Sequence, residues 1–482
     1  MHDFAPVGQV IGRLSIVLGA SMLLPALVDL IDGSENWLAF VLSGFLTLAG
    51  GQALIFANSG GERRGLKRPQ AFLLTTIVWV ILPLFGCLPF IIGAPGVGFT
   101  DAYFEAMSGL TTTGSTVFSA LDEAPRGMLL WRALLQWYGG VGIIVVAIVF
   151  LPVLKIGGMQ FFRSESFDLG GDILPRATAI AGQLAWIYIA LTVACMLSYS
   201  AAGMSAFDAL CHAMTTLATG GLANYDDSFA SFDPVVHYVA VIFMWAAALP
   251  FLNFIQITRG RARPLLTDPQ VQAFLGIIAV TAAVLVTWQV AADDRDFEPA
   301  LRAALFNVTS VITGTGYATE DYGAWGGMPA GIFFILALIG GCTGSTSCSA
   351  KVFRYQVLFA ALSVQIRRIH SPHGVYPLRY QGRPIEPEVV SSIMGFFFVF
   401  FTALSVWTIL LSMIGLDTLT AISGSVSALA NLGPGLGPVI GPTGNFAGLP
   451  DVAKWLLALG MVLGRLEFLS VMVLFMPSFW QR

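Results

Sequence analysis

Long apolar segments alternate with short polar ones along the whole of this 482-residue chain. A helix that crosses the hydrocarbon core of a bilayer needs about 20 apolar residues. Suitable segments lie at residues 10–30, 37–57, 70–93, 131–154, 182–203, 234–257, 271–292, 328–363, 389–415 and 452–478. The pattern predicts ten crossing segments and an all-α chain. The eighth segment is too long for one crossing and is interrupted by GGCTGSTSCSAK (340–351).

The composition supports a multi-pass membrane protein. Hydrophobic residues make up 56% of the chain and charged residues only 11%, whereas soluble domains carry about 25% charged residues. The five cysteines are scattered and show no spacing of a zinc site or a disulfide framework. The sequence MHDFAPVGQVIGR lacks a basic region followed by a small-residue cleavage site, so we expect the first apolar segment to be kept as a membrane helix.

The basic residues are distributed unequally between the two sides of the predicted membrane. Most of the 24 Lys and Arg residues lie in segments 62–68, 155–176, 259–263 and 351–383, which share one side. The other side holds Arg126, Arg132, Arg295, Arg302 and Lys454. The positive-inside rule makes the first side cytoplasmic. Acidic residues lean toward the outer side, where they would raise the local concentration of cations.

Four 14-residue windows on the outer side resemble one another. They are DAYFEAMSGLTTTG (101–114), DALCHAMTTLATGG (208–221), AALFNVTSVITGTG (303–316) and TAISGSVSALANLG (420–433). Position 8 is always a hydroxyl residue and position 14 is always glycine. Each window lies between two crossing segments and is semi-apolar but too short to cross. The sequence therefore predicts a unit of helix, re-entrant pore helix, turn and helix that occurs four times.

The turns at the ends of these windows are suited to binding a cation. An irregular turn inside a bilayer survives only where it is buried in protein or lines water. Glycine permits φ > 0, which lets successive carbonyls point the same way. Four such turns in a ring would offer layers of oxygens that replace the hydration shell of a monovalent cation, as in potassium filters. The partly negative C-terminal ends of the pore helices favour a cation there as well.

The motifs SGLTTTGST, TTLATGGL, ITGTGYAT, LANLGPG, GGCTGSTSCSAKVFR and LGRLEF resemble those of the Trk/Ktr/HKT superfamily, and in particular the membrane subunits of bacterial Trk potassium uptake systems. The resemblance covers nearly the whole chain. It implies an all-α integral membrane protein with four pseudo-symmetric helix–pore helix–helix repeats around a central pore, preceded by two extra transmembrane helices. It implies potassium uptake and no enzymatic activity.

The resemblance divides the chain into five parts. The two N-terminal helices occupy 1–66, and repeat 1 occupies 67–160 with its filter turn at 111–115. Repeat 2 occupies 161–265 with its turn at 218–222. Repeat 3 occupies 266–384, with its turn at 313–317 and an intramembrane gate loop at 340–350. Repeat 4 occupies 385–482 with its turn at 430–434.

The same resemblance assigns potassium-binding filter residues. They are Thr112, Thr113, Gly114, Thr219, Gly220, Gly221, Gly314, Thr315, Gly316, Asn431, Leu432 and Gly433. The residue after each glycine differs among the turns: Ser115, Leu222, Tyr317 and Pro434. We therefore expect a less regular filter than one built from four identical loops, with less strict discrimination of potassium from sodium. Because Leu432 has no hydroxyl, backbone carbonyls are expected to supply most of the ligands.

The interrupted eighth segment is the predicted gate. Helix propensity is low over its run of small residues, and an unwound stretch at membrane depth is expected to face a cavity. The resemblance assigns gating to Gly340, Gly341, Gly344, Ser345, Thr346, Lys351 and Arg465. The family usually has a Gly-Gly pair shortly before the lysine, where this chain has Cys348 and Ser349.

Arg465 lies within the last apolar segment, where an ionised side chain is costly unless it faces water or a partner. Glu467 leaves a different helix face, so the two are not expected to pair. The resemblance places Arg465 in the pore below the filter.

The expected partners follow from the resemblance as well. It implies a TrkA-like cytosolic regulatory subunit that binds NAD and ATP, a homodimer, and a bacterial inner-membrane location. Potassium is the substrate, and no organic cofactor and no nucleic acid are expected on this chain. The basic segment 351–383 is either a docking face for that subunit or a solvated surface facing lipid headgroups.

Two other classes of protein were weighed. A secondary transporter that couples potassium to protons or sodium also uses broken helices, but inverted repeats need not place four turns on one side. A membrane-embedded enzyme would need converging His, Asp or Glu inside the spans, which apart from Glu467 are nearly bare of them. The sequence leaves open whether flux is coupled.

Overall fold

The computed structural model describes residues 4–59, 68–146, 158, 173–292 and 294–480. Within these residues the structure is helical apart from one small hairpin, in which β1 (Arg379–Tyr380) pairs with β2 (Arg383–Pro384). The predicted boundaries at 66/67 and 160/161, and the end of the fourth crossing segment, lie outside the described residues. The predicted boundary at 265/266 falls within the short helix α13 (Arg263–Thr267).

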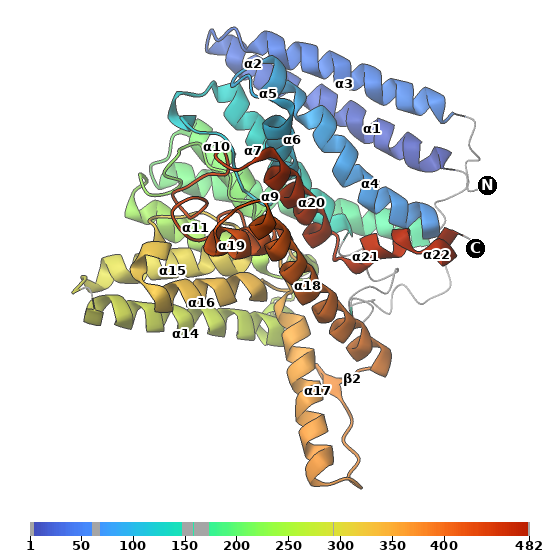
Figure 1. The fold of residues 1–482 in the computed structure, drawn as a ribbon, viewed down its shortest axis with the longest axis vertical. Coiled ribbons are helices and arrows are strands. Elements are labelled where there is room, and N and C mark those ends of the chain that lie inside the picture. Colours follow the sequence, from blue (N-terminus) through green and yellow to red (C-terminus); the bar gives the residue numbers. More distant parts are fainter. Residues whose placement is uncertain (1–3, 60–67, 147–157, 159–172, 293, 481–482) are drawn as a thin grey trace.

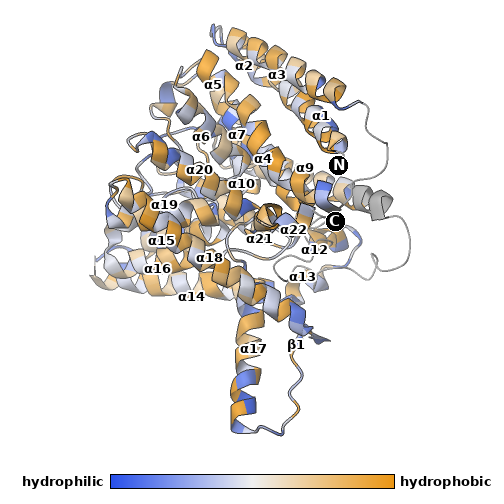
Figure 2. Ribbon diagram, turned by 45° about the vertical axis from the view of Figure 1, so that its right-hand side comes forward, coloured by the Kyte–Doolittle hydropathy of each residue, from blue (hydrophilic) through white to orange (hydrophobic). Residues whose placement is uncertain are grey.

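Seven helical segments are long and apolar enough to cross a membrane within the described part of the chain, or eight if one bent pair is counted. Five of them are α3 (Trp37–Ala57), α7 (Arg126–Val145), α9 (Ile173–Ala201), α14 (Pro269–Ala292) and α18 (Pro387–Met413). The other two are interrupted near one end, as α1 (Ala5–Ser21) with α2 (Leu23–Ile31), and α4 (Arg68–Gly86) with α5 (Leu88–Ile92). Figure 2 shows hydrophobic residues along these helices. The two chain ends lie on the same side of the bundle (Figure 1).

Three of the ten predicted crossing segments are strongly bent or broken. The interruption of the eighth was predicted, whereas the sixth and tenth were expected to be simple spans, and for these two the prediction was wrong. The sixth consists of α11 (Pro234–Ala248) and α12 (Phe251–Thr258), which meet at 96°. Pro250 explains this bend, because a proline has no N–H and keeps the preceding residue out of the helical conformation. The eighth consists of α16 (Gly327–Ile339), a loop, and α17 (Val352–His370), which projects away from the bundle in Figure 1.

The tenth segment is continuous only over α20 (Asp451–Arg465). Positive φ angles at Glu467 (57°) and Phe468 (37°) end that helix. Short pieces follow: α21 (Leu469–Met472), η6 (Val473–Phe475) and α22 (Pro477–Trp480). Two further 3₁₀ turns, η1 (Leu121–Glu123) and η5 (Tyr322–Trp325), lie in the loops after the first and third windows.

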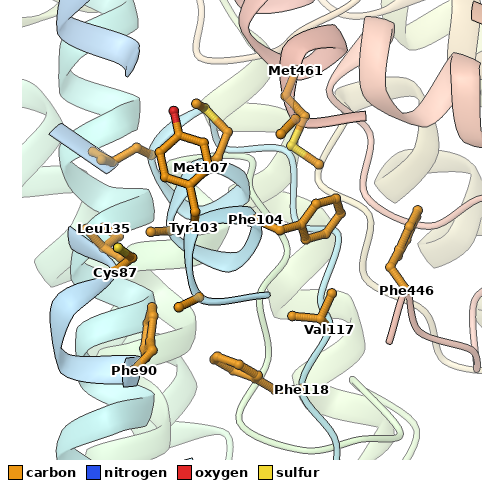
Figure 3. Packing of buried hydrophobic residues seen from close by; sticks show 14 of the residues in the cluster. Cys87, Phe90, Tyr103, Phe104, Met107, Val117, Phe118, Leu135, Phe446 and Met461 are labelled. Carbon is orange, nitrogen blue, oxygen red and sulfur yellow. The ribbon is translucent and has the colours of Figure 1, made fainter. Parts of the chain in front are cut away.

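The four short helices predicted before the turns are present. They are α6 (Phe99–Leu110), α10 (Ala206–Leu217), α15 (Phe297–Thr313) and α19 (Thr418–Ala430). Each is buried over most of its last two turns. Figure 3 shows part of the packing around α6: Phe104 faces Phe446, and Phe90 lies beside Phe118. Side chains from other segments of the chain thus pack against α6.

Candidate functional site

The four short helices end in the same hydrogen-bonded turn. The N–H of position 13 donates to the carbonyl of position 8 in every window, at 2.9–3.0 Å. The N–H of position 12 donates to the carbonyl of position 9 in every window, at 3.0–3.4 Å. This pair of bonds is the Schellman motif, which satisfies carbonyls that a helix end leaves free. The four windows that resemble one another in sequence therefore also share one backbone geometry at their ends.

Positive φ angles alternate through each turn. They occur at position 12, in Thr112 (52°), Thr219 (49°), Gly314 (75°) and Asn431 (51°), and at position 14, in Gly114 (88°), Gly221 (75°), Gly316 (84°) and Gly433 (101°). A left-handed conformation costs a residue with a Cβ about 1–2 kcal/mol. Three of the four turns accept this cost at position 12, so the surrounding structure imposes the conformation.

The turns make a closed ring through their glycines. A Cβ on Gly433 would lie 2.9 Å from the carbonyl oxygen of Thr113. A Cβ on Gly114, Gly221 or Gly316 would overlap the corresponding carbonyl of Gly220, Thr315 or Leu432. In each case position 14 of one turn faces position 13 of another, in the cyclic order 1–2–3–4–1. Four equivalent carbonyls therefore lie at the four interfaces of one ring.

The threonine hydroxyls of the turns are occupied within the protein. Thr113 Oγ1 bonds to Thr111 Oγ1 (2.8 Å) and accepts from Asn431 Nδ2 (2.9 Å). Thr315 Oγ1 bonds to Thr313 Oγ1 at 2.7 Å. These bonds leave the backbone as the main source of oxygens toward the centre of the ring.

A cavity lies on each side of the ring. One is an open depression of about 200 Å³, lined by all four position-14 glycines together with Ser115 and Pro434. The other has only about 20 Å³ and is lined by Asn431 of the fourth turn and by Cys348, Lys351, Arg465 and Glu467. The ring thus joins an open polar mouth to a smaller charged chamber.

The loop between α16 and α17 forms part of that chamber and is tied to the bend of the sixth segment. The carbonyls of Ala247 and Ala248, freed at the end of α11, accept from the N–H groups of Thr346 (3.3 Å) and Cys342 (3.0 Å). Ser347 Oγ donates to the carbonyl of Thr313, the first residue of the third turn, at 2.7 Å. The loop is therefore connected both to a neighbouring helix and to the ring.

The other predicted gate residues lie in the same loop. Gly340 and Gly344 have φ angles of 80° and 78°, and Lys351, which is buried, has a φ of 70°. The hydroxyl of Ser345 donates to the carbonyl of Cys342 at 2.6 Å, and a Cβ on Gly341 would lie 2.7 Å from Ser347. Ser349 has a φ of 66°, a left-handed conformation that glycine adopts more easily than serine.

Arg465 reaches this loop from the end of α20. Its Nη1 lies 2.6 Å from Cys348 Sγ and 3.4 Å from the carbonyl of Thr346. Its Nε and Nη2 are buried without a hydrogen-bond partner among the described residues. Glu467 forms its ion pair with Arg354, at 2.5 Å, so the prediction that Glu467 and Arg465 do not pair is confirmed.

All five basic residues predicted on the outer side form ion pairs. The pairs are Arg126–Asp32, Arg132–Glu105, Arg295–Glu320, Arg302–Glu298 and Lys454–Asp101. The hydrogen bond from Arg302 lowers the pKa of Glu298. Since each positive charge is offset locally, the remaining carboxylates dominate the potential on this side.

Arg132 of α7 and Glu105 of α6 form a buried ion pair that the sequence did not indicate, with a distance of 2.8 Å between Nε and Oε1. Arg132 also donates to the carbonyl of Ala223, and Glu105 accepts from the N–H of Val117. The pair thus supports the loops after the first and second turns. Its partners are far apart in sequence, so no local pattern indicated it.

Gln136 is a second residue that the sequence did not single out. Its Nε2 donates to the carbonyl of Gly220 (2.7 Å), and its Oε1 accepts from the N–H of Leu222 (3.1 Å). The sequence did contain one signal for this role, an amide side chain inside an otherwise apolar helix. A buried polar group of this kind is normally hydrogen-bonded.

These features define a class: a multi-pass helical membrane protein whose helices converge on a ring of backbone carbonyls between two cavities. The family model for TrkH, described as a cation transport protein, matches residues 38–482. The chain is 42% identical to the Trk system potassium uptake protein TrkI of Halomonas elongata, over 100% of this chain and 98% of that protein. It is 36% identical to the Trk system potassium uptake protein TrkH of Salmonella typhimurium, over the full length of both.

A solved structure agrees with this assignment. The crystal structure of the potassium transporter TrkH from Vibrio parahaemolyticus matches with a TM-score of 0.91 and 34% identity, covering 99% of this chain and 100% of that one. The chain belongs to the TrkH family of cation transport proteins. The predicted class, an all-α integral membrane protein, is confirmed, and the family is one of membrane ion transporters and not of enzymes.

Proposed function

We propose that this protein carries potassium ions into the cell through the ring formed by the four turns, each contributed by one helix–pore helix–helix repeat. The observation that carries the proposal is the closed order of contacts from each position-14 glycine to the position-13 carbonyl of the next turn. A ring of oxygens in a water-excluded site can replace the hydration shell of a weakly hydrated cation. The names of the relatives, potassium uptake proteins of Trk systems, support potassium as the ion.

The proposed path begins at the open mouth lined by Gly114, Gly221, Gly316 and Gly433. The ion loses water at the carbonyls of positions 12 and 13 and then reaches the chamber beside Arg465. The loop 340–351 blocks the way onward and has to move for the ion to leave. Its anchors at Ala247, Thr313 and Arg465 are the contacts that an opening motion would break.

Replacing Gly316 tests the ring directly. A side chain there would overlap the carbonyl of Leu432 and adopt a φ of 84°, so Gly316→Ser should abolish uptake. The matched control is Gly276→Ser, the same change in repeat 3 at an exposed helical glycine with nothing within 4 Å. A bacterium lacking potassium uptake should grow at low potassium with the wild type and with Gly276→Ser, but not with Gly316→Ser.

The outcome that would contradict the proposal is equally specific. A wild-type protein shown to be in the membrane that fails to restore growth argues against potassium uptake. Restoration by Gly316→Ser argues against the ring as the path. Because the residues after the four glycines differ, we also propose only moderate potassium-over-sodium discrimination, and competition of sodium with potassium uptake measures it.

The proposal also covers where the protein lies and what it assembles with. We place it in the bacterial inner membrane as a homodimer, gated by a TrkA-like cytosolic subunit that binds NAD and ATP. The basic side chains Arg367, Arg368 and Arg379 are exposed around the end of α17 and β1, which suits them to bind an acidic surface of such a subunit. Co-purification of a nucleotide-binding partner with the wild type, and its loss with these three arginines changed to glutamate, tests the docking face.

The alternative, coupling of potassium flux to protons or sodium, uses the same path. Uptake into vesicles at a fixed membrane potential distinguishes the two. An imposed proton or sodium gradient changes the final potassium accumulation only if flux is coupled.

A further inference from the structure

The residue immediately after the filter glycine makes different contacts in the four turns. In two turns it carries a hydroxyl, at Ser115 and Tyr317, and in the other two it is apolar, at Leu222 and Pro434. All four are at most partly exposed at the outer end of the ring. In two turns this residue contacts the position-8 hydroxyl of the preceding window, which is Thr215 for Tyr317 and Ser427 for Ser115. Position 8 of the other two windows is Ser108 and Ser310.

The interface between the second and third turns is closed by hydroxyl groups. The phenol of Tyr317 is hydrogen-bonded to Thr215 Oγ1 and lies 3.3 Å from Thr216 Oγ1. Thr216 is in turn 2.8 Å from the phenol of Tyr199. Tyr317 is fully buried against Phe229, with ring centroids 4.2 Å apart. A rigid aromatic ring therefore connects the third turn to the second short helix, α10.

The interface between the fourth and first turns is closed in a related way. Ser115 Oγ donates to the carbonyl of Gly433 at 2.8 Å and lies 3.4 Å from Ser427 Oγ. Ser427 Oγ donates to the same carbonyl. Two hydroxyls from different repeats thus hold one filter glycine.

Among the residues that the structure describes, the two remaining interfaces show no such contact. Ser108 Oγ is buried without a hydrogen-bond partner there, and Leu222, the residue of the second turn that corresponds to Tyr317, has no polar side-chain atom to offer. Ser310 Oγ turns back to the carbonyl of Tyr317 in its own turn at 2.7 Å, and Pro434 offers no donor. The turn at Leu222 is held from behind by Gln136 through its backbone.

We propose that the two hydroxyl clamps, Tyr317–Thr215 and Ser115–Ser427–Gly433, are positioning devices that set the width of the outer filter and so its discrimination between potassium and sodium. In the cyclic order of the turns they lie at opposite interfaces, so two opposite sides of the ring are joined through hydroxyl groups and the other two sides are not. The clamps touch no ion; they act through the backbone of Gly316, Gly433 and their neighbours. This inference rests on the proposed potassium path.

The test compares hydroxyl deletions at clamped and unclamped interfaces. Tyr317→Phe and Thr215→Val each remove one partner of the first clamp with little change in shape. Ser108→Ala is the matched control, because it removes the equivalent hydroxyl where no partner exists. Each variant is expressed in a bacterium lacking potassium uptake, its amount in the membrane is measured, and initial potassium uptake is followed against increasing sodium.

Tyr317→Phe and Thr215→Val should each lower the preference for potassium over sodium by about two- to tenfold, the value of one net hydrogen bond. The double variant should be no worse than either single change, since the two groups share one bond. Thr215→Ser keeps the hydroxyl and should behave as the wild type, and Ser108→Ala should do so too. Ser115→Ala should repeat the loss at the second clamp.

The results separate this inference from the proposed function. Absence of potassium uptake by the wild type would count against the function itself. Normal uptake with unchanged sodium competition in Tyr317→Phe and Thr215→Val would overturn the clamps alone. If Tyr317→Phe does not reach the membrane, the same hydrogen bond is tested from its Thr215 side. Equal sodium competition in Thr215→Val and Thr215→Ser would then overturn the clamp. A loss in Ser108→Ala as large as in Thr215→Val would also overturn the clamps.

Discussion

The thiol of Cys348 lies 2.6 Å from the Nη1 atom of Arg465. This contact joins the loop between α16 and α17 to the end of α20, in the chamber beside the fourth turn. Both side chains are buried, and Cys348 lies shortly before Lys351, in the region where the sequence resemblance led us to expect a Gly-Gly pair. The contact therefore adds a specific restraint to the loop in the conformation described here.

Removing that restraint should ease movement of the loop. Loss of one net hydrogen bond is worth about 1 kcal/mol, which changes a closed-to-open equilibrium about fivefold. We expect Cys348→Ala to raise the maximal rate of potassium uptake by up to that factor. Cys348→Ser retains a polar group of similar size and should stay near the wild type. Equal rates in all three proteins, at equal abundance in the membrane, would show that the contact does not restrain the gate.

Arg465 should also affect the passing ion directly. Its Nε and Nη2 are buried and lack hydrogen-bond partners among the described residues, and its side chain lines the chamber through which the proposed ion path runs. We expect Arg465→Gln to change both the KM and the maximal rate of uptake, with a higher rate because a repulsive charge is gone. Arg465→Lys keeps the charge and should change the rate less. Unchanged KM and maximal rate in Arg465→Gln would reject the pore role.

Much of this arrangement could be predicted from the sequence, because its signals are local. Apolar length identified the crossing helices, and the glycine at position 14 with the hydroxyl at position 8 identified the four short helices and their turns. The windows fold alike because each ends in the same Schellman motif, although the position-12 residues Thr112, Thr219, Gly314 and Asn431 look unrelated. The left-handed backbone conformation at position 12 occurs in all four turns, but the side chains at this position share no chemical property from which it could be predicted.

The parts that could not be predicted depend on contacts between distant segments. Gln136 and Arg132 look like ordinary residues of an apolar helix, and only the fold brings them to Gly220 and Glu105. The bend at Pro250 was readable from the proline. Its consequence, carbonyls at Ala247 and Ala248 that accept hydrogen bonds from the loop between α16 and α17, was not.

The ion pair between Arg354 and Glu467 should contribute mainly to stability. It connects α17 to the end of the last crossing segment, both side chains are buried, and the guanidinium stacks on Phe396 at 3.9 Å. Removing one partner of a buried pair leaves an uncompensated charge and costs about 3–5 kcal/mol. Glu467→Gln should therefore lower the thermal unfolding temperature of the purified protein clearly.

An exposed ion pair supplies the control for that measurement. Arg302 and Glu298 form an i,i+4 pair on the surface of α15, and surface pairs contribute little. Arg302→Gln should leave the unfolding temperature almost unchanged. An equally small shift of the unfolding temperature in Glu467→Gln would mean that the charge left on Arg354 is solvated by water. The ion pair would then contribute little to stability.

The buried pair of Arg132 and Glu105 should act as one unit in holding the outer mouth. Glu105 accepts from Thr116 and Val117 as well as from Arg132, so it orders the chain just after the first filter turn. Arg132→Met or Glu105→Gln alone leaves buried groups unsatisfied and should cost about 3–5 kcal/mol of unfolding free energy. The double variant should cost clearly less than the sum, since neither partner is then left charged and alone. Additive losses across this double-mutant cycle, measured by thermal unfolding in detergent, would show that the two residues contribute independently.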